Sequence, residues 1–346
     1  MFSKNDMVLT RDLQAGMIIA QPVFSEKRQI LLEQGAVVTA DTIKQLTAWG
    51  VWGVSVACPN TPPFTNPDLF HMYNETLDVI SSTFKKARRF KEVPLAECSE
   101  LVGNYVELMI DIESVLDNLY RIRTHHEYTF THSLHVAILT GLLGKWMGFT
   151  GSNLKNLILA GLLHDIGKAL IPQRILDKPG PLTTAEMDII KLHSTQGYNL
   201  LGNCIEIPEE VKLGVLQHHE REDGSGYPFG LKGKDISIYA KFVAIADVYD
   251  AMTTDRVYRA KHPPITTIHT MLTHMHTKLD SIICLTFSAK LQKFLLGSRV
   301  LLNNGLQGTV VQMPNIATAR PVVRLDSGVL VDLDNDEKII ITEILD

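Results

Sequence analysis

The sequence has few of the features that mark secreted, membrane or nucleic-acid-binding proteins. Its 346 residues include four scattered cysteines and no CxxC pair, which excludes a disulfide framework or zinc knuckle and is typical of reduced thiols. No apolar run approaches the roughly 20 residues of a membrane span, and no signal-peptide core is present. The net charge of −5 argues against general nucleic-acid or anionic-membrane binding. We therefore expect a cytoplasmic protein without a membrane span or a nucleic-acid polymer as partner.

Composition and periodicity together predict a mainly α protein of several domains. Hydrophobic residues make up 45% and charged residues 21% of the chain, an ordinary globular balance. The pattern predicts a small α/β module over residues 1–59, a helical connector over 60–120, an all-helical bundle over 121–297 and a small β segment over 298–346.

The first third of the chain carries no evident chemistry. Strands are expected near residues 17–20 and 51–56, with a helix capped at Thr39 between them, and a proline-rich linker follows at 59–67. Helices are expected over 68–90 and 95–120, as in a connector or dimer seam, so a homodimer is one interpretation. The first ends in the basic run Lys85–Arg89, which we interpret as a solvated helix face.

From residue 125 to 297 the pattern is helical, punctuated by glycine and proline. After Gly297 the period changes to that of short strands separated by glycine, asparagine and aspartate turns. We expect strands at 299–302, 308–311, 321–324 and 329–332, forming a structural β-meander.

The chemistry centres on the heptapeptide Leu162–Lys168, where an apolar run ends in His164 beside Asp165. Burying an imidazole and a carboxylate without partners is costly, and a bound cation removes that cost. Lys168 follows His164 by four residues, so on a helix the two share a face, and the lysine could meet an anion beside the metal. Taken alone, the motif fits an exposed His-Asp pair at a helix end equally well.

Further histidines and an aspartate recur along the sequence, each separated from the one before it by about the number of residues in one helix and its connecting loop. The gaps between successive groups are 32, 28, 25 and 28 residues, so a helical bundle can direct them at one centre. Five imidazoles and two carboxylates suit two metal ions, with Asp165 as the natural bridge. The mixed donors favour Fe or Mn, with Zn, Co or Ni as alternatives, over Mg or Ca. The predicted ligands are His132, His164, Asp165, His193, His218, His219 and Asp247.

Considered singly, most of these residues also have a structural interpretation. His132 and His193 are as readily core or surface histidines, whereas a carboxylate in the apolar run around Asp247 would be destabilising without a partner. Jointly, the spacing favours the metal site. The other histidines have no place in the pattern and are interpreted as structural or surface residues: His71, His125, His126, His135, His262, His269, His274 and His276.

Several motifs over residues 125–297 resemble those of the HD-GYP phosphodiesterases. The matching segments are His164–Lys168, Ile175–Gly180, His218–Glu220, Asp223–Pro228, Gly230–Gly233 and Ile245–Arg256. The resemblance implies an all-helical HD-domain bundle with a centre of two or three metals. It also implies hydrolysis of a cyclic dinucleotide, typically cyclic di-GMP, to a linear product.

The resemblance assigns roles to particular residues, and the same seven positions become the metal ligands. Asp165 and Lys168 are the residues expected to act in catalysis, Lys168 by contacting a phosphate. Gly226 and Tyr227 lie in the GYP loop, which implies substrate contact and also binding of diguanylate cyclase (GGDEF) domains. Arg256 and Arg259 match positions that face the second phosphate.

One departure concerns a third metal. Some members of the family carry a glutamate four residues before the first ligand histidine, and this chain has Tyr128 there. Glu127 is adjacent, but on a helix it would point about 100° away. We therefore expect two metal ions.

Two metals can lower the pKa of a bridging water, hold the resulting hydroxide in line with phosphorus and neutralise phosphoryl charge. The predicted function is therefore hydrolysis of cyclic di-GMP to pGpG by a metal-bridged hydroxide, with cyclic GMP-AMP as an alternative substrate. A nucleotide sensor or scaffold that signals through a partner is a second hypothesis. A hydrolase of ordinary nucleotides is a third, which the GYP loop and extra histidines disfavour.

Overall fold

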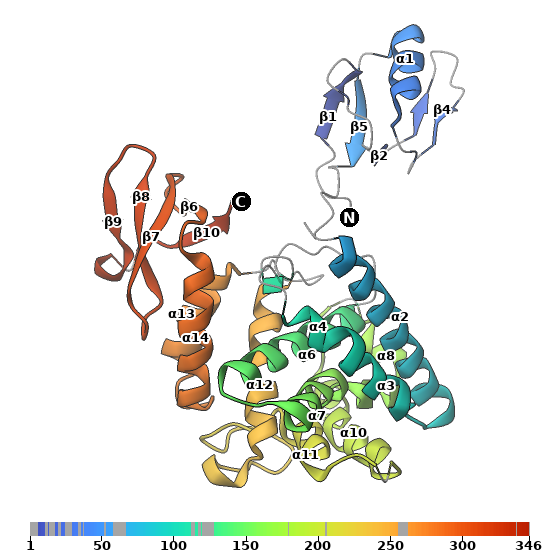
Figure 1. Ribbon diagram of the computed structural model, residues 1–346, viewed down its shortest axis with the longest axis vertical. Helices are drawn as coiled ribbons and strands as arrows, with labels where there is room; N and C mark the ends of the chain where they lie inside the picture. Colours follow the sequence, from blue (N-terminus) through green and yellow to red (C-terminus); the bar gives the residue numbers. More distant parts are fainter. Residues whose placement is uncertain are drawn as a thin grey trace. The chain divides into compact units, whose positions relative to one another are not determined.

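The computed structural model of the chain consists of two compact units, Met1–Phe70 and His71–Asp346 (Figure 1). The described residues are 6–10, 13, 18–19, 22–24, 30–33, 36, 38–51, 53–57, 67–111, 115–116, 119, 128–178, 180–204, 206–254, 262–336 and 338–345. The finer boundaries expected at residues 59, 120 and 297 remain predictions.

The first unit is the expected α/β module. Strands β1 (Asp6–Leu9), β5 (Gly53–Ala57) and β2 (Ile18–Ile19) form an antiparallel sheet in that order, and β3 (Val23–Phe24) pairs with β4 (Ile30–Leu32). Helix α1 (Ala40–Ala48) begins at Thr39, whose hydroxyl accepts a hydrogen bond from the Thr42 N–H at 3.1 Å. Ile19, Leu46 and Val54 are buried in its core.

Helix α2 (Pro67–Phe90) opens the helical part and buries one face, including Tyr73, Leu77 and Phe84. The single helix expected over 95–120 is wrong. Helix α3 (Leu95–Leu101) passes into a π-helical segment (Val102–Val106) and then α4 (Glu107–Met109), which ends in a turn. The widened segment contains Gly103, a residue of low helix propensity, at the point where the helix is interrupted.

The core of the second unit is formed by four helices that pack against one another in Figure 1. Helix α6 is buried continuously from Phe130 to Gly144, which is why its sequence is apolar on every side. These helices are α6 (Tyr128–Trp146), α7 (Gly151–Leu163), α11 (Glu209–Gln217) and α12 (Ile238–Thr253).

Shorter helices connect and extend this core. They are the 3₁₀ helix η3 (Ile166–Leu170), α8 (Gln173–Leu176), α9 (Thr184–Lys191), α10 (His193–Gly202), η4 (Gly233–Asp235), α13 (Pro264–His274) and α14 (Ser281–Leu295). Because α7 ends at Leu163 and η3 begins at Ile166, His164 and Lys168 do not share one α-helix. Their placement follows from this tight turn instead.

The chain ends in an antiparallel five-stranded sheet in the order β10-β6-β7-β8-β9. The strands are β6 (Arg299–Leu302), β7 (Gln307–Asn315), β8 (Arg320–Leu325), β9 (Leu330–Asp332) and β10 (Ile341–Ile344), with the 3₁₀ helix η5 (Leu333–Asn335) before the last. Sequence patterning identified the first four and missed β10. The predicted fold class is confirmed. Among the described helices, none is long and apolar enough to cross a membrane.

Candidate metal centre

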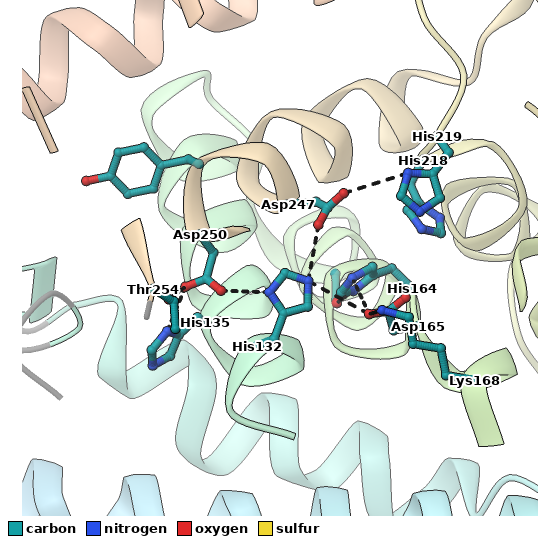
Figure 2. Close-up of polar contacts among 12 residues, drawn as sticks. His132, His135, His164, Asp165, Lys168, His218, His219, Asp247, Asp250 and Thr254 are labelled. Carbon is teal, nitrogen blue, oxygen red and sulfur yellow. Dashed lines mark hydrogen bonds and ion pairs between the residues drawn. The ribbon is translucent and has the colours of Figure 1, made fainter. Parts of the chain in front are cut away.

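The structure brings all seven predicted ligands together in the helical core. Figure 2 labels all of them except His193. They come from α6, the end of α7, the start of α10, the segment after α11, and α12. The side chains of His164, Asp165, His193 and His218 are at most 1% exposed. Residues as far apart as 132 and 247 in the chain therefore share one buried polar site.

The ligand atoms form two groups with a carboxylate between them. His132, His164 and Asp247 make one group and His193, His218 and His219 the other, and within each group the ligand atoms lie within 4.8 Å of one another. Asp165 faces both, because its Oδ2 lies 3.3 Å from His164 Nε2 and its Oδ1 lies 3.4 Å from His193 Nε2. This arrangement is consistent with a metal site.

Backbone carbonyls fix the tautomers of three of the histidines. The Nδ1–H groups of His164, His193 and His218 donate to the carbonyl oxygens three residues earlier, each at 2.7 Å. A carbonyl oxygen can only accept, so in the neutral ring the proton is on Nδ1 and the lone pair is on Nε2. The turn that orients each ring thus also prepares its inward nitrogen as a metal ligand.

The donor set fits a divalent metal. The Nε2 atoms of His193 and His218 are 3.2 Å apart, so two lone pairs face each other inside the protein. Within the described part of the chain, the buried Nε2 of His164 also has no hydrogen-bond partner. Such inward lone pairs are unfavourable unless a cation accepts them, and imidazole with carboxylate is a donor set for Fe, Mn, Zn or Co.

At most positions in the site, the local electrostatics favour the protonation state that can bind a metal. Burial lowers the pKa of His193 to about 4 and holds the pKa values of His218 and His219 well below their usual range. Burial alone would raise the pKa of Asp165, but Lys168 and His164 hold it well below its usual range. These imidazoles are neutral and the carboxylate is charged at neutral pH.

The pKa of His132 differs from those of the other histidines predicted as ligands. Burial opposes its charged form, but hydrogen bonds to Asp247 and Asp250 outweigh that effect and raise its pKa to about 9. Its Nε2 lies 3.1 Å from Asp247 Oδ1 and its Nδ1 lies 2.6 Å from Asp250 Oδ2. Metal binding through Nε2 therefore requires release of a proton.

Asp250 is a supporting residue that sequence reasoning missed. Its Oδ2 accepts from His132 Nδ1, while its Oδ1 accepts from His135 Nδ1 at 2.7 Å and from the Thr254 hydroxyl at 3.1 Å (Figure 2). On the other side of that ring, His135 Nε2 lies 2.8 Å from the Tyr73 hydroxyl of α2. His135, interpreted as structural, thus belongs to a buried network that orients a ligand. The sequence did carry one indication of this role: Asp250 follows Asp247 by three residues, so the two lie on the same face of a helix.

We expect Asp250→Asn to lower metal affinity or kcat/KM by about 10- to 100-fold, the usual cost of losing a group that orients a metal ligand. An amide has one acceptor oxygen, so His132 and His135 cannot both keep their carboxylate partner. Metal titration and steady-state kinetics measure the effect, with Asp188→Asn on the exposed face of α9 as control. Equal metal affinity and turnover in both variants would contradict the assigned support.

Lys168 lies at the edge of the candidate centre. Its Nζ is 2.6 Å from Asp165 Oδ2, and its side chain is only 23% exposed. The lysine is therefore held beside the central carboxylate by a charged hydrogen bond, close to where an anion would approach the metals.

The GYP loop packs directly on the ligand segment His218-His219. Tyr227 stacks on His219 with ring centroids 4.6 Å apart, so one face of the tyrosine is covered by a predicted ligand. A Cβ on Gly226 would lie 2.4 Å from the His219 carbonyl oxygen, so glycine is required by the close backbone approach. Glu220, which was not assigned a role, accepts hydrogen bonds from Phe229 N–H at 2.7 Å and Leu231 N–H at 2.9 Å and fixes the loop.

Five residues named in the sequence analysis lie outside the described residues: His125, His126, Glu127, Arg256 and Arg259. Tyr128 is described, and its ring stacks on His132 with centroids 5.4 Å apart. A phenol ring thus lies against His132 at the position where some HD-GYP proteins carry a third-metal glutamate.

Comparison with known proteins places this site in a family. The model of the HD domain family matches residues 114–283. A cyclic di-GMP phosphodiesterase of Pseudomonas aeruginosa is 33% identical over 246 residues, which cover 71% of this chain and 59% of that protein. The chain is an HD-domain protein related to the HD-GYP cyclic di-GMP phosphodiesterases.

Other relatives of this HD-domain protein differ in named substrate. A 3′3′-cGAMP-specific phosphodiesterase of Vibrio cholerae is 40% identical over 154 residues, covering 44% of this chain and 35% of that protein. The solved structure of an HDG"Y"P protein from Bdellovibrio bacteriovorus covers 83% of this chain and 99% of its own, with a TM-score of 0.55 and 16% identity, which supports the fold. The chain spans 59% or less of the length of these two curated relatives.

Proposed function

We propose that this HD domain hydrolyses one phosphodiester bond of a cyclic dinucleotide, with cyclic di-GMP as substrate and linear pGpG as product. The observation that carries the proposal is the position of Asp165 between two three-residue ligand groups. The relationship to cyclic dinucleotide phosphodiesterases supports the substrate class.

The residues that would hold two divalent metals are His132, His164 and Asp247 on one side, and His193, His218 and His219 on the other, with Asp165 shared. Bound transition metals supply Lewis acidity toward the phosphate and increase the acidity of water at neutral pH. The chain itself contributes orientation, since carbonyls three residues back fix three imidazoles and Asp250 fixes His132.

Lys168 supplies the cation that a phosphodiester needs next to the metals. Its half-buried ammonium contacts Asp165 and can turn toward an arriving phosphoryl oxygen. A lysine held in a partly buried site stabilises negative charge more strongly than one in water, because solvent screens it less. We assign Lys168 to stabilising charge on the phosphate.

The substrate could be cyclic di-GMP or 3′3′-cGAMP, which differ in one base. Relatives named for either nucleotide match this chain at 33% and 40% identity. Cyclic di-GMP is proposed because the relative named for it matches the longer stretch, 246 residues against 154. Competition between the two nucleotides for one active enzyme distinguishes them.

We expect the protein to bind two metals per chain and to accumulate pGpG during hydrolysis of cyclic di-GMP. Tyr128, whose ring stacks on His132, replaces a carboxylate, and a phenol with an unperturbed pKa near 10 is a poor ligand at neutral pH. The linear product lacks the constraint that positions both phosphates, so its further cleavage to GMP should be slow. Metal counting on anaerobically purified protein and time-resolved product chromatography measure both outcomes.

Three outcomes would contradict this proposal in different ways. Intact cyclic di-GMP and 3′3′-cGAMP after incubation with metal-loaded protein would end the enzyme assignment. Tight binding without turnover would favour a sensor or scaffold instead. Three tightly held ions, or GMP without a pGpG phase, would show that another residue supplies a further ligand.

The GYP loop is also proposed as the surface that meets a diguanylate cyclase domain. Phe229 supports this, because its side chain is 63% exposed while the neighbouring backbone is fixed by Glu220. An exposed aromatic on a held loop is the type of residue that anchors protein interfaces.

A further inference from the structure

Four histidines of the candidate metal centre are oriented in two different ways. His164, His193 and His218 each donate to a carbonyl oxygen three residues earlier in the chain, so a local turn fixes each ring. His132 instead donates to a carboxylate on another helix, Asp250 of α12. The orientation of His132 therefore depends on how α6 and α12 pack and on what holds Asp250.

A chain of three hydrogen bonds extends this support to helix α2. Asp250 Oδ2 accepts from His132 Nδ1 at 2.6 Å, and its Oδ1 accepts from His135 Nδ1 at 2.7 Å (Figure 2). His135 Nε2 in turn lies 2.8 Å from the hydroxyl of Tyr73. Tyr73, His135 and Asp250 are each at most 3% exposed, so water does not compete for these hydrogen bonds.

The hydroxyl at the end of this chain fixes the protonation pattern of His135. Each oxygen of Asp250 faces an imidazole Nδ1, so the carboxylate is the acceptor for both rings. With its proton on Nδ1, the neutral ring of His135 presents a lone pair at Nε2, to which the Tyr73 O–H donates. Tyr73 thus favours the one tautomer of His135 that can hold Asp250.

The two ligand groups therefore differ in what holds them. The carbonyls that orient His193 and His218 lie inside residues 114–283, which the HD domain family model matches. The His132 group (His132, His164 and Asp247) also depends on a residue of α2, which precedes the matched residues.

We propose that Tyr73 is a positioning residue of the metal centre, which acts through His135 and Asp250 to hold His132 and makes one of two metal positions depend on α2. The inference rests on the proposed two-metal centre and adds to it a residue from outside the family match. Without the hydroxyl, His135 is free to rotate or to take its other tautomer, so Asp250 loses a donor and His132 loses its fixed partner. Metal affinity then falls in the His132 group alone.

The test removes single hydroxyl groups from the full-length chain and measures binding of Mn²⁺. Metal-free protein is titrated with Mn²⁺ while EPR measures the free ion, which gives the number of bound ions and their dissociation constants. We expect Tyr73→Phe to raise one of two constants by about 10-fold, the lower end of the usual range for partners of metal ligands, and to leave the other unchanged. Thermal unfolding of the metal-free protein checks that the variant is folded.

Tyr239→Phe is the matched control. Tyr239 is a buried tyrosine of α12, and its hydroxyl donates to the Asn153 carbonyl of α7 at 3.1 Å. The variant loses a hydroxyl and a hydrogen bond between helices, but it should keep both dissociation constants.

A double variant, Tyr73→Phe with Asp250→Asn, distinguishes positioning through Asp250 from general loosening of the core. It should bind Mn²⁺ no more weakly than Asp250→Asn alone, because residues that act through one network are not additive. Additive losses would show that Tyr73 acts by another contact, such as its interaction with Thr131, and would overturn the inference.

The remaining outcomes separate this inference from the proposed function. Unchanged constants in Tyr73→Phe, or equal weakening of both, would overturn the inference and leave the phosphodiesterase proposal in place. Metal binding without hydrolysis, with one constant that still depends on Tyr73, would contradict the phosphodiesterase proposal and support the inference. A wild-type chain that binds no metal would contradict both.

Discussion

Asp165→Asn is expected to lower kcat/KM for the cyclic dinucleotide by at least about 10³-fold, the scale of removing a central electrostatic group. The carboxylate lies between His164 and His193, and its two oxygens face opposite ligand groups. The amide keeps the shape of the side chain and removes the charge that two cations would share. Its N–H groups can also donate to the inward Nε2 atoms and occupy them, so metal should be lost while the fold is kept.

Metal content, kcat/KM and the melting temperature measured on the same samples separate loss of the centre from loss of the fold. Asp188→Asn is the matched control, because Asp188 lies on α9 with a side chain that is 63% exposed and pairs only with Lys191 among the described residues. A variant at position 165 with two metals and near wild-type turnover would rule out Asp165 as the shared ligand. Unfolding of that variant would instead show that the charge is needed for stability.

Gly167→Ala is expected to lower activity by at least about 10²-fold, although glycine has no side chain that could bind a metal. A Cβ at this position would lie 1.9 Å from the His193 carbonyl oxygen and 2.6 Å from the Gly197 N–H nitrogen. Both are backbone atoms, so α10 or the turn after Asp165 must move. His193 begins α10, and its Nε2 lies 3.4 Å from Asp165, so this movement separates two ligands. A misplacement of about 1 Å can cost about 10²-fold in rate.

Overpacking of this kind also destabilises, typically by about 1–3 kcal/mol. Gly202→Ala, at the end of the same helix, is the matched control because a Cβ there meets no atom within 4 Å. The comparison uses thermal unfolding, metal content and kcat/KM. If both alanine variants behave alike, the close contact of Gly167 with α10 is not what positions His193.

The sequence was informative where one residue type repeats at helical spacing. Apolar periodicity predicted the helical core, and the change of period after Gly297 predicted the terminal strands. It failed at Leu95–Met109, where a π-helical segment interrupts the expected helix, and at β10, whose short strand carries little pattern. Local irregularities depend on neighbouring packing, which periodicity does not record.

For the candidate site, the residue types and gaps were enough to choose seven positions that the structure brings together, because helix length limits where side chains can converge. Their role as metal ligands, with Asp165 shared, stays a prediction. Hydrogen bonds between distant residues were not predictable in the same way. The network from Tyr73 through His135 and Asp250 to His132 joins α2, α6 and α12, and no local pattern connects those positions. Likewise, the basic run at 85–89 was interpreted as one solvated face.

The sequence by itself therefore determined the fold class, the histidines and aspartates that converge, and the motif whose carboxylate lies between His164 and His193. Tertiary structure alone decided which imidazole nitrogen faces inward, since that depends on the carbonyl that each Nδ1–H reaches. It also decided that Lys85 and Arg88 share a pocket with Lys168, whereas Lys86 does not. The physical reason is that chemistry depends on distances between atoms, and the packing of helices sets those distances for residues remote in the chain.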